Sequence, residues 1–389
     1  WDEVTTKFVS IDEILKSVGS AAEFRRMKKN ILGRSVTEIR SLSGSAVALY
    51  AAQAVLECVG AHIFACAEKD AAAYLMNDFY ALLGEESVMF FPAGYKRSVQ
   101  FGQQDASGQV QRTVALNALR GFGVETPDRK RGEKKEYLII CTYPEAIAEK
   151  VADAEELEKR TLGIGTGEKI SMGFLSDALD EFGFTRVDFV HEPGQYSMRG
   201  GIFDIFSFAE NKPYRLDFFG DEVESIRRFD VASQLSTERM ERIEVVPDLK
   251  AAVGAGRSVS LAQFATDATW WADDMDHILR RVDDIRRKML AEAPEPREVD
   301  NLVSSRKQII EGVKGHALML RRDNVRELPA AEKVEFNTSP QPSFNKQYAL
   351  LAQDIHDHAE QGYRTYILSE NKAQVERLEN IFGAEGFPK

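Results

Sequence analysis

The chain has 389 residues, of which 43% are hydrophobic and 29% are charged, as in a soluble globular protein long enough for two or three hydrophobic cores. Its formal net charge is −12, whereas a freestanding nucleic-acid-binding protein normally carries a basic surface that neutralises phosphates. That class is therefore disfavoured, and protein partners are expected first.

The sequence contains no apolar run near the ~20 residues that a membrane-spanning helix needs, and no basic leader precedes an apolar segment after Trp1. We therefore expect a cytoplasmic protein without a membrane partner. The three cysteines, Cys58, Cys66 and Cys141, lie in apolar segments without the spacing of metal ligands. We expect buried free thiols in a reducing compartment, no metal site and no bound cofactor.

Strands and helices alternate through the first part of the chain. Helical spacing of apolar residues predicts the helices, and short apolar runs predict the strands. The predicted order is helix 11–30, strand 35–42, a helix through 59, strand 62–67, helix 69–83, strand 88–91, helix 110–119 and strand 137–141. This alternation is typical of a parallel sheet covered by helices.

The turn after strand 35–42 stands where a phosphate-binding P-loop would lie. A P-loop needs glycines that let backbone amides surround phosphates, a lysine for the β and γ oxygens, and a hydroxyl for magnesium. If Gly44 is its second glycine, Ser45 replaces the lysine, Ala46 replaces the hydroxyl residue and Ile39 replaces the first glycine. The sequence therefore predicts a degenerate P-loop without ATP chemistry.

The strand 137–141 is where we looked for the acidic pair of a Walker B motif, whose carboxylate holds magnesium. The residues that follow are Thr142, Tyr143, Pro144 and Glu145. We interpret Glu145 as a first-turn helix residue, stabilised by the helix dipole. No catalytic residue is predicted.

Two alternating segments, 214–219 and 222–229, flank Gly220 and Asp221 and predict a β-hairpin. Side chains alternate between the two faces of a strand. One face of the first segment is therefore apolar and is predicted to be core, whereas Arg215 and Phe219 lie on the other face.

Upstream, Arg199 alternates with apolar residues before the pair Gly200 and Gly201, so it can join the same open face. Arginine and aromatic side chains are enriched at protein interfaces. Exposed arginines are nevertheless usually solvated, and a single exposed phenylalanine is ordinary. The pattern alone leaves both an interface and a solvated face open.

The last part of the chain returns to alternating helices and strands. We expect a helix over 276–290, a helix over 346–361, a strand over 363–368 and a helix over 371–382, the last two completing the sheet begun before 150. The predicted class is α/β: a degenerate P-loop-type parallel sheet, formed by residues 1–149 and 249–389, interrupted by an inserted β-rich α+β domain over 150–248.

Three segments carry a resemblance to a known family: EPGQYSMRGGIFDIF, PYRLDFFGDEVESIRRFD and VVPD. In this order they resemble the central domain that bacterial transcription-repair coupling factors (Mfd) share with the excision-repair protein UvrB. The resemblance is strong over 185–247 and weaker over 35–389. It implies that the inserted domain docks onto UvrA, with Arg199, Arg215 and Phe219 at the matching contact positions.

The resemblance also implies that residues before 150 form a UvrB-type nucleotide fold that has lost its ATP chemistry. We therefore expect a UvrA-recruiting, non-catalytic N-terminal module. The whole family protein resembles an ATP-driven DNA translocase or helicase that displaces stalled RNA polymerase and couples transcription to nucleotide excision repair. RNA polymerase and double-stranded DNA would bind segments beyond Lys389. The alternative is a nucleotide-dependent, damage-processing enzyme of UvrB type, which would need a P-loop lysine and a Walker B acid.

Overall fold

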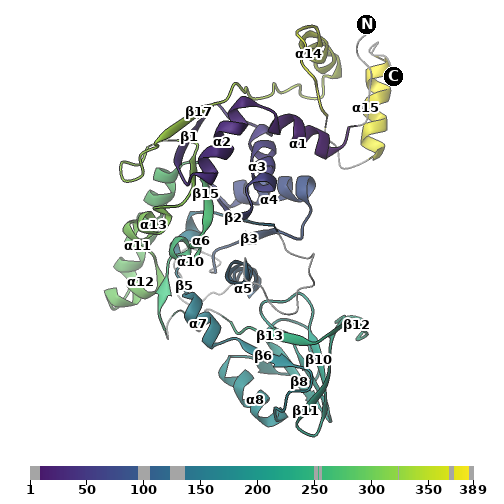
Figure 1. Cartoon of the computed structure of the whole chain (residues 1–389), viewed down its shortest axis with the longest axis vertical. Helices are drawn as coiled ribbons and strands as arrows, with labels where there is room; N and C mark the ends of the chain where they lie inside the picture. Colours follow the sequence, from purple (N-terminus) through teal and green to yellow (C-terminus); the bar gives the residue numbers. More distant parts are fainter. Residues whose placement is uncertain are drawn as a thin grey trace.

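The computed structural model describes residues 9–94, 106–122, 136–248, 253, 256–322, 324–367 and 372–384. Figure 1 shows a large sheet flanked by helices and, below it, a second region rich in strands. The large sheet is parallel throughout its described pairings, and the second sheet is mostly antiparallel. The predicted α/β class is confirmed.

The large sheet takes strands from both ends of the chain. Its seven strands, in spatial order, are β17 (Glu332–Glu335), β1 (Val36–Arg40), β16 (Leu318–Leu320), β15 (Ala268–Ala272), β2 (Gly60–Ala65), β4 (Tyr137–Thr142) and β3 (Val88–Phe91). The chain leaves this sheet after β4 and returns at β15. Because β16 and β15 lie between β1 and β2, these two later strands belong to the middle of the sheet, whereas β17 forms one of its edges.

Helices cover both faces of the large sheet. Those before 150 are α1 (Ile11–Gly19), α2 (Ala22–Leu32), α3 (Ala46–Glu57), α4 (Lys69–Leu83), α5 (Ala106–Gly121) and α6 (Pro144–Ala148). Those after 248 include α10 (Leu261–Phe264), α11 (Met275–Glu292), α12 (Pro296–Leu302) and α13 (Arg306–Val313). In Figure 1, α3 and α4 lie to one side of the sheet and α11 and α13 to the other. Among the residues described, no helix is long and apolar enough to cross a lipid bilayer.

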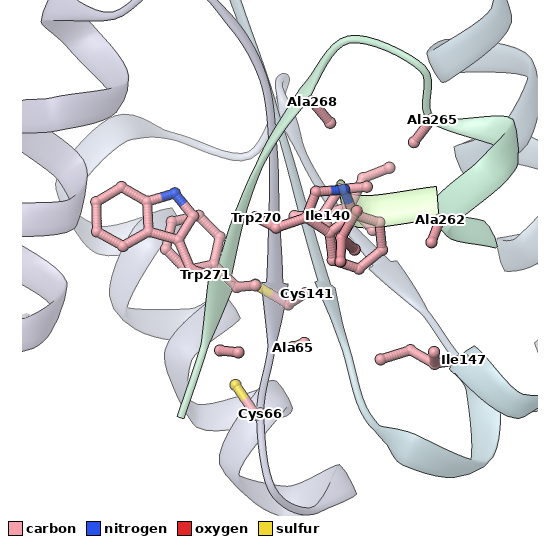
Figure 2. Close-up of a cluster of buried hydrophobic side chains, with 14 of the residues drawn as sticks. Ala65, Cys66, Ile140, Cys141, Ile147, Ala262, Ala265, Ala268, Trp270 and Trp271 are labelled. Carbon is pink, nitrogen blue, oxygen red and sulfur yellow. The ribbon is translucent and has the colours of Figure 1, made fainter. Parts of the chain in front are cut away.

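Two adjacent tryptophans on the central strand β15 fill the core on both faces of the sheet. Trp270 and Trp271 point in opposite directions (Figure 2), as consecutive residues of a strand must. Trp271 stacks on Phe64 at 5.2 Å between ring centroids, and its Nε1 donates to Nδ1 of the buried His62 at 3.2 Å. The three cysteines are buried and free, as predicted.

The second region contains a six-stranded sheet in which each strand lies beside its neighbours in sequence. The strands are β7 (Thr185–Arg186), β8 (Gln195–Arg199), β9 (Ile202–Ile205), β10 (Tyr214–Phe219), β11 (Glu222–Phe229) and β12 (Ser236–Met240). Its core includes apolar residues of α8 (Met172–Glu181) and of the strand pair β6 (Leu162–Gly165) and β13 (Arg242–Val245). The predicted hairpin is confirmed, because β10 and β11 have the predicted bounds and pair in antiparallel fashion.

Short elements connect the two regions. Strand β5 (Val151–Ala152) is followed by α7 (Ala154–Lys159) and pairs with β14 (Ser258–Val259), so the segment leaving the large sheet lies beside the one returning to it. Val151, Leu157 and Val246 belong to the core of the large sheet, whereas Val245 belongs to the core of the second region and Leu162 packs against it. The exact domain limits stay a prediction.

The strand predicted over 363–368 is wrong for the part that the structure describes. Residues 363–367 form no strand, and Leu368 lies outside the described residues. The flanking helices are present as α14 (Tyr348–Glu360) and α15 (Lys372–Ala384), beyond α1 and away from the second region (Figure 1). The edges of the large sheet are formed by β17 and β3. Residues 363–367 therefore do not add a strand to this sheet.

Candidate protein-interaction site

The turn between β8 and β9 depends on its two glycines. Gly200 has φ of 63°, a conformation that costs glycine little and other residues more. At Gly201 an added Cβ would lie 3.0 Å from the carbonyl oxygen of Phe218, and the Gly201 carbonyl accepts a hydrogen bond from the Phe218 amide at 2.8 Å. The glycines therefore bring this turn close to β10, although β9 lies between β8 and β10.

The two faces of β10 differ as the alternation predicted. Tyr214, Leu216 and Phe218 are buried in the core of the second region. Arg215 lies on the opposite face, and so does Phe219, which is 81% exposed. This second face, which we call the open face, carries polar residues, the exposed ring of Phe219 and the buried ring of Phe229 under Arg215.

A buried carboxylate joins the two predicted arginines. Asp204 lies on β9 opposite Arg215 of β10, and its side chain is 1% exposed. It accepts a hydrogen bond from Nη2 of Arg199 at 2.7 Å. It also accepts two from Arg215, from Nε at 2.7 Å and from Nη2 at 2.8 Å. We call these three residues the arginine cluster.

Arg215 is more buried than a surface arginine, with 15% of its side chain exposed. Its remaining donors reach Gln234, from Nη1 to the backbone oxygen at 3.3 Å and from Nη2 to Oε1 at 3.1 Å. Its guanidinium carbon lies 4.3 Å from the ring centre of Phe229. Hydrogen bonding to Asp204 raises the pKa of Arg215 above its ordinary value. Arg215 is therefore a fixed part of the sheet.

Arg199 is the more accessible arginine of the cluster, with 34% of its side chain exposed. Its guanidinium carbon lies 4.3 Å from the ring centre of Phe189, an exposed residue. Ile202, which faces Arg199 across the strand pair, is also exposed. Exposed apolar side chains therefore lie next to Arg199.

The structure brings together two of the three predicted contact residues. Asp204 joins Arg199 and Arg215, whereas Phe219 is four residues further along β10 than Arg215, or about 13 Å in an extended strand. The sequence analysis missed Asp204. The signal was present in the segment IFDIF, where a single acidic residue interrupts an apolar strand on its open face.

The degenerate P-loop precedes α3. Gly44 has φ of 60°, and Ser45 makes no side-chain hydrogen bond to the first turn of α3, which begins at Ala46. The preceding residues bond to Thr338 instead: the amide of Ser43 donates to Thr338 Oγ1 at 3.0 Å. Backbone and hydroxyl contacts therefore hold this loop in the structure.

An acidic pair follows β15, which lies closer to β1 in the sheet than β4 does. In the sheet, β15 is the second strand from β1, at about 10 Å, and β4 is the fourth strand from β1, at about 19 Å. The pair is Asp273 and Asp274. Arg321 bridges Asp273, at 3.0 Å, and the carbonyl oxygen of Leu42, at 3.3 Å. Arg322 pairs with Asp274 at 2.9 Å.

These contacts alter the interpretation of the acidic residues. Asp273 and Asp274 follow β15, but Arg321 pairs with Asp273 and Arg322 pairs with Asp274, so both carboxylates are neutralised. Glu145 lies in the first turn of α6, as predicted, and pairs with Arg281. Within the described ranges, three or more histidine, cysteine or acidic side chains nowhere gather as a metal site would require.

Comparison with known proteins identifies the class of the second region. Residues 162–250 match the family model of the UvrB interaction domain. This match covers the six-stranded sheet, the arginine cluster and Phe219. The β-rich region is therefore similar to the UvrB interaction domain over residues 162–250.

The chain is also similar to named bacterial proteins. It is 39% identical over 123 residues to the transcription-repair-coupling factor of Escherichia coli K12, covering 32% of this chain and 10% of that protein. It is 29% identical over 176 residues to that of Bacillus subtilis 168, covering 45% and 14%. For that of Myxococcus xanthus the values are 27% over 186 residues, covering 46% and 14%.

The aligned part thus spans 10–14% of the length of these relatives. The matches confirm the resemblance to the N-terminal, UvrB-like region of transcription-repair coupling factors. The assignment of Arg199, Arg215 and Phe219 to a UvrA contact stays a prediction.

Proposed function

We propose that this chain is the UvrA-recruiting, non-catalytic module of a transcription-repair coupling factor. The observation that carries the proposal is the open face of the second region, where the arginine cluster and the exposed Phe219 lie on one sheet. Arginine and aromatic residues are typical anchors of protein interfaces. UvrA is the partner that the family resemblance implies.

The charge of this face favours an acidic contact on the partner. Arg199 and Arg215 carry two positive charges against the one negative charge of Asp204, which leaves one positive charge in the cluster at neutral pH. The whole chain has a formal charge of −12, so this face differs from the average surface. Exposed Phe189 and Ile202 add apolar area beside Arg199, and Phe219 adds an exposed ring further along β10.

The chemistry of the large sheet supports a module without ATP turnover. Ser45 and Ala46 replace the lysine and hydroxyl residue of a P-loop, and Arg321 pairs with Asp273, the first acidic residue after β15. A nucleotide-dependent enzyme of UvrB type would need these groups in their active roles. The parallel sheet then serves as a scaffold for the inserted domain.

The activity of the whole parent protein is part of the same proposal. It would be an ATP-dependent DNA translocase that displaces stalled RNA polymerase in the cytoplasm. RNA polymerase and double-stranded DNA would bind outside this chain. This chain would then bring UvrA to the stalled site.

The test is direct binding of the 389-residue chain to purified UvrA, measured by calorimetry at several salt concentrations. We expect a complex with micromolar or tighter affinity, equivalent to about −8 kcal/mol or better. The affinity is expected to fall as salt rises, because guanidinium groups meet carboxylates in a partly exposed interface. No complex at the lowest salt concentration would refute the proposed function.

A further inference from the structure

The two arginines of the cluster differ in the donors that they have left for a partner. A guanidinium carries five N–H groups. Arg215 uses four of them, two toward Asp204 and two toward Gln234. Arg199 makes one hydrogen bond within the part of the chain that the structure describes, from Nη2 to Asp204.

The geometry of the two contacts with Asp204 also differs. Arg215 binds both carboxylate oxygens with Nε and Nη2, the two-point arrangement that fixes a guanidinium most firmly. Arg199 binds Oδ2 alone and rests over the half-exposed ring of Phe189. Asp204 therefore holds Arg215 by two hydrogen bonds and Arg199 by one.

A carboxylate as buried as Asp204 is costly unless it is paired. Its two arginines supply more positive charge than this one carboxylate needs, so stability alone does not explain the second arginine. Holding a side chain in its bound orientation before the partner arrives lowers the entropy cost of binding. A guanidinium held by one edge over an aromatic ring still presents its other N–H groups to the outside.

We propose that Asp204 is a positioning residue of the UvrA-binding surface: it aims Arg199 at a carboxylate of UvrA, while Arg215 serves as its fixed support. The inference rests on the proposed function. It names the chemistry of the contact: a partner carboxylate on Arg199, next to an apolar group that covers Phe189 and Ile202.

The experiment is a double-mutant cycle in the 389-residue chain, with UvrA affinity and melting temperature measured for each protein. The variants are Asp204→Asn, which keeps the shape and removes the charge, Arg199→Ala, and the two combined. We expect Asp204→Asn to weaken UvrA binding about tenfold or more in the parent and less than about twofold in the Arg199→Ala background. A purely structural role would lower the affinity by the same factor in both backgrounds.

The matched control is Asp217→Asn. Asp217 lies on the same face, two residues along β10 from Arg215, and pairs with Arg227, so the charge change is the same. We expect it to change UvrA affinity less than about twofold, because Arg199 keeps its orientation.

A second pair of variants covers the case in which Asp204→Asn does not fold. Phe189→Ala removes the exposed ring under Arg199, and Arg199→Lys keeps the charge but loses the planar fork. Each is expected to lose about threefold or more in affinity without a lower melting temperature. Parent-like UvrA binding by these two variants, or by a folded Asp204→Asn variant, overturns the inference about Asp204 but leaves the proposed function intact. Failure of the parent chain to bind UvrA refutes the proposed function as well.

Discussion

Replacement of Arg215 by alanine tests how much the more buried arginine of the cluster contributes to stability. Arg215 donates two of its four side-chain hydrogen bonds to Asp204, a carboxylate that is 1% exposed. The variant leaves Asp204 with its bond from Arg199 and uncovers the ring of Phe229. The expected result is a loss of stability in the second region, which the alternation of the sequence alone did not indicate.

The magnitude follows from the burial of Asp204. Removing one partner of a fully buried ion pair costs about 3–5 kcal/mol. Arg199 remains 2.7 Å from Asp204 and water can enter the vacated space, so we expect a value near or below the lower limit, about 2–3 kcal/mol. Arg199→Ala leaves both bonds from Arg215 and is expected to cost about 1 kcal/mol. Phe219→Ala removes an exposed ring and is expected to stay within about 0.5 kcal/mol.

The assay has to report on the second region. Trp270 and Trp271 belong to the core of the large sheet, so their fluorescence follows the other core. Hydrogen exchange of the amides in β9 and β10 follows the sheet that holds the cluster. We expect faster exchange there in Arg215→Ala and parent-like exchange in Phe219→Ala. Equal exchange in the two variants would refute the idea that Arg215 stabilises a buried carboxylate.

Three further predictions concern the large sheet. A chain ending at residue 248 lacks β15 and β16, the middle of the sheet, and is expected to be poorly soluble or partly unfolded in sedimentation and thermal melting. The chain is expected to show no measurable ATP binding by calorimetry, and Ser45→Lys alone is expected not to restore it, because Arg321 still pairs with Asp273. Burial lowers the pKa of His62 from its ordinary 6.5 to about 4. Because the folded protein disfavours the charged form of His62, its contribution to the free energy of unfolding is complete above pH 6.5 and is lost as the pH falls from 6.5 toward 4. The His62→Gln variant is expected to show a weaker pH dependence when the melting temperature is measured across this range.

Each of these predictions has an outcome that contradicts it. Sharp, parent-like melting of the chain that ends at 248 would show that residues 1–248 fold without the later strands. Micromolar ATP affinity in the parent would show that phosphate binding does not need the missing lysine. An acid transition of the His62→Gln variant that matches the parent would show that this histidine does not contribute to the pH dependence.

The hairpin of β10 and β11 could be predicted from the sequence because its determinants are local. A two-residue turn containing Gly220 and the alternation of β10 indicate the hairpin and the two faces of β10, although a register shift interrupts the pairing with β11 between Asp217 and Phe218. The open-face positions of Arg215 and Phe219 followed from that alternation. Their surroundings did not, because Asp204 and Gln234 reach Arg215 from other strands and loops, and cross-strand neighbours depend on the strand order.

The failures have the same physical origin. The acidic pair after β15 was missed because the order of strands in a parallel sheet is set by packing, so that a strand late in the sequence lies near β1. The strand predicted over 363–368 has a suitable apolar pattern, but an alternating segment becomes a strand only where a neighbouring strand offers its hydrogen bonds. Local patterns gave the elements, and tertiary packing decided their neighbours.

The central claim is tested most directly by the UvrA affinity of Phe219→Ala, compared with Phe174→Ala. Both side chains are largely exposed, so neither variant is expected to unfold, but Phe174 lies on α8 while Phe219 lies on the open face of the sheet. The account predicts that Phe219→Ala loses about 2 kcal/mol of binding, roughly thirtyfold, while Phe174→Ala binds like the parent. Equal affinities of both variants and the parent for UvrA would contradict it.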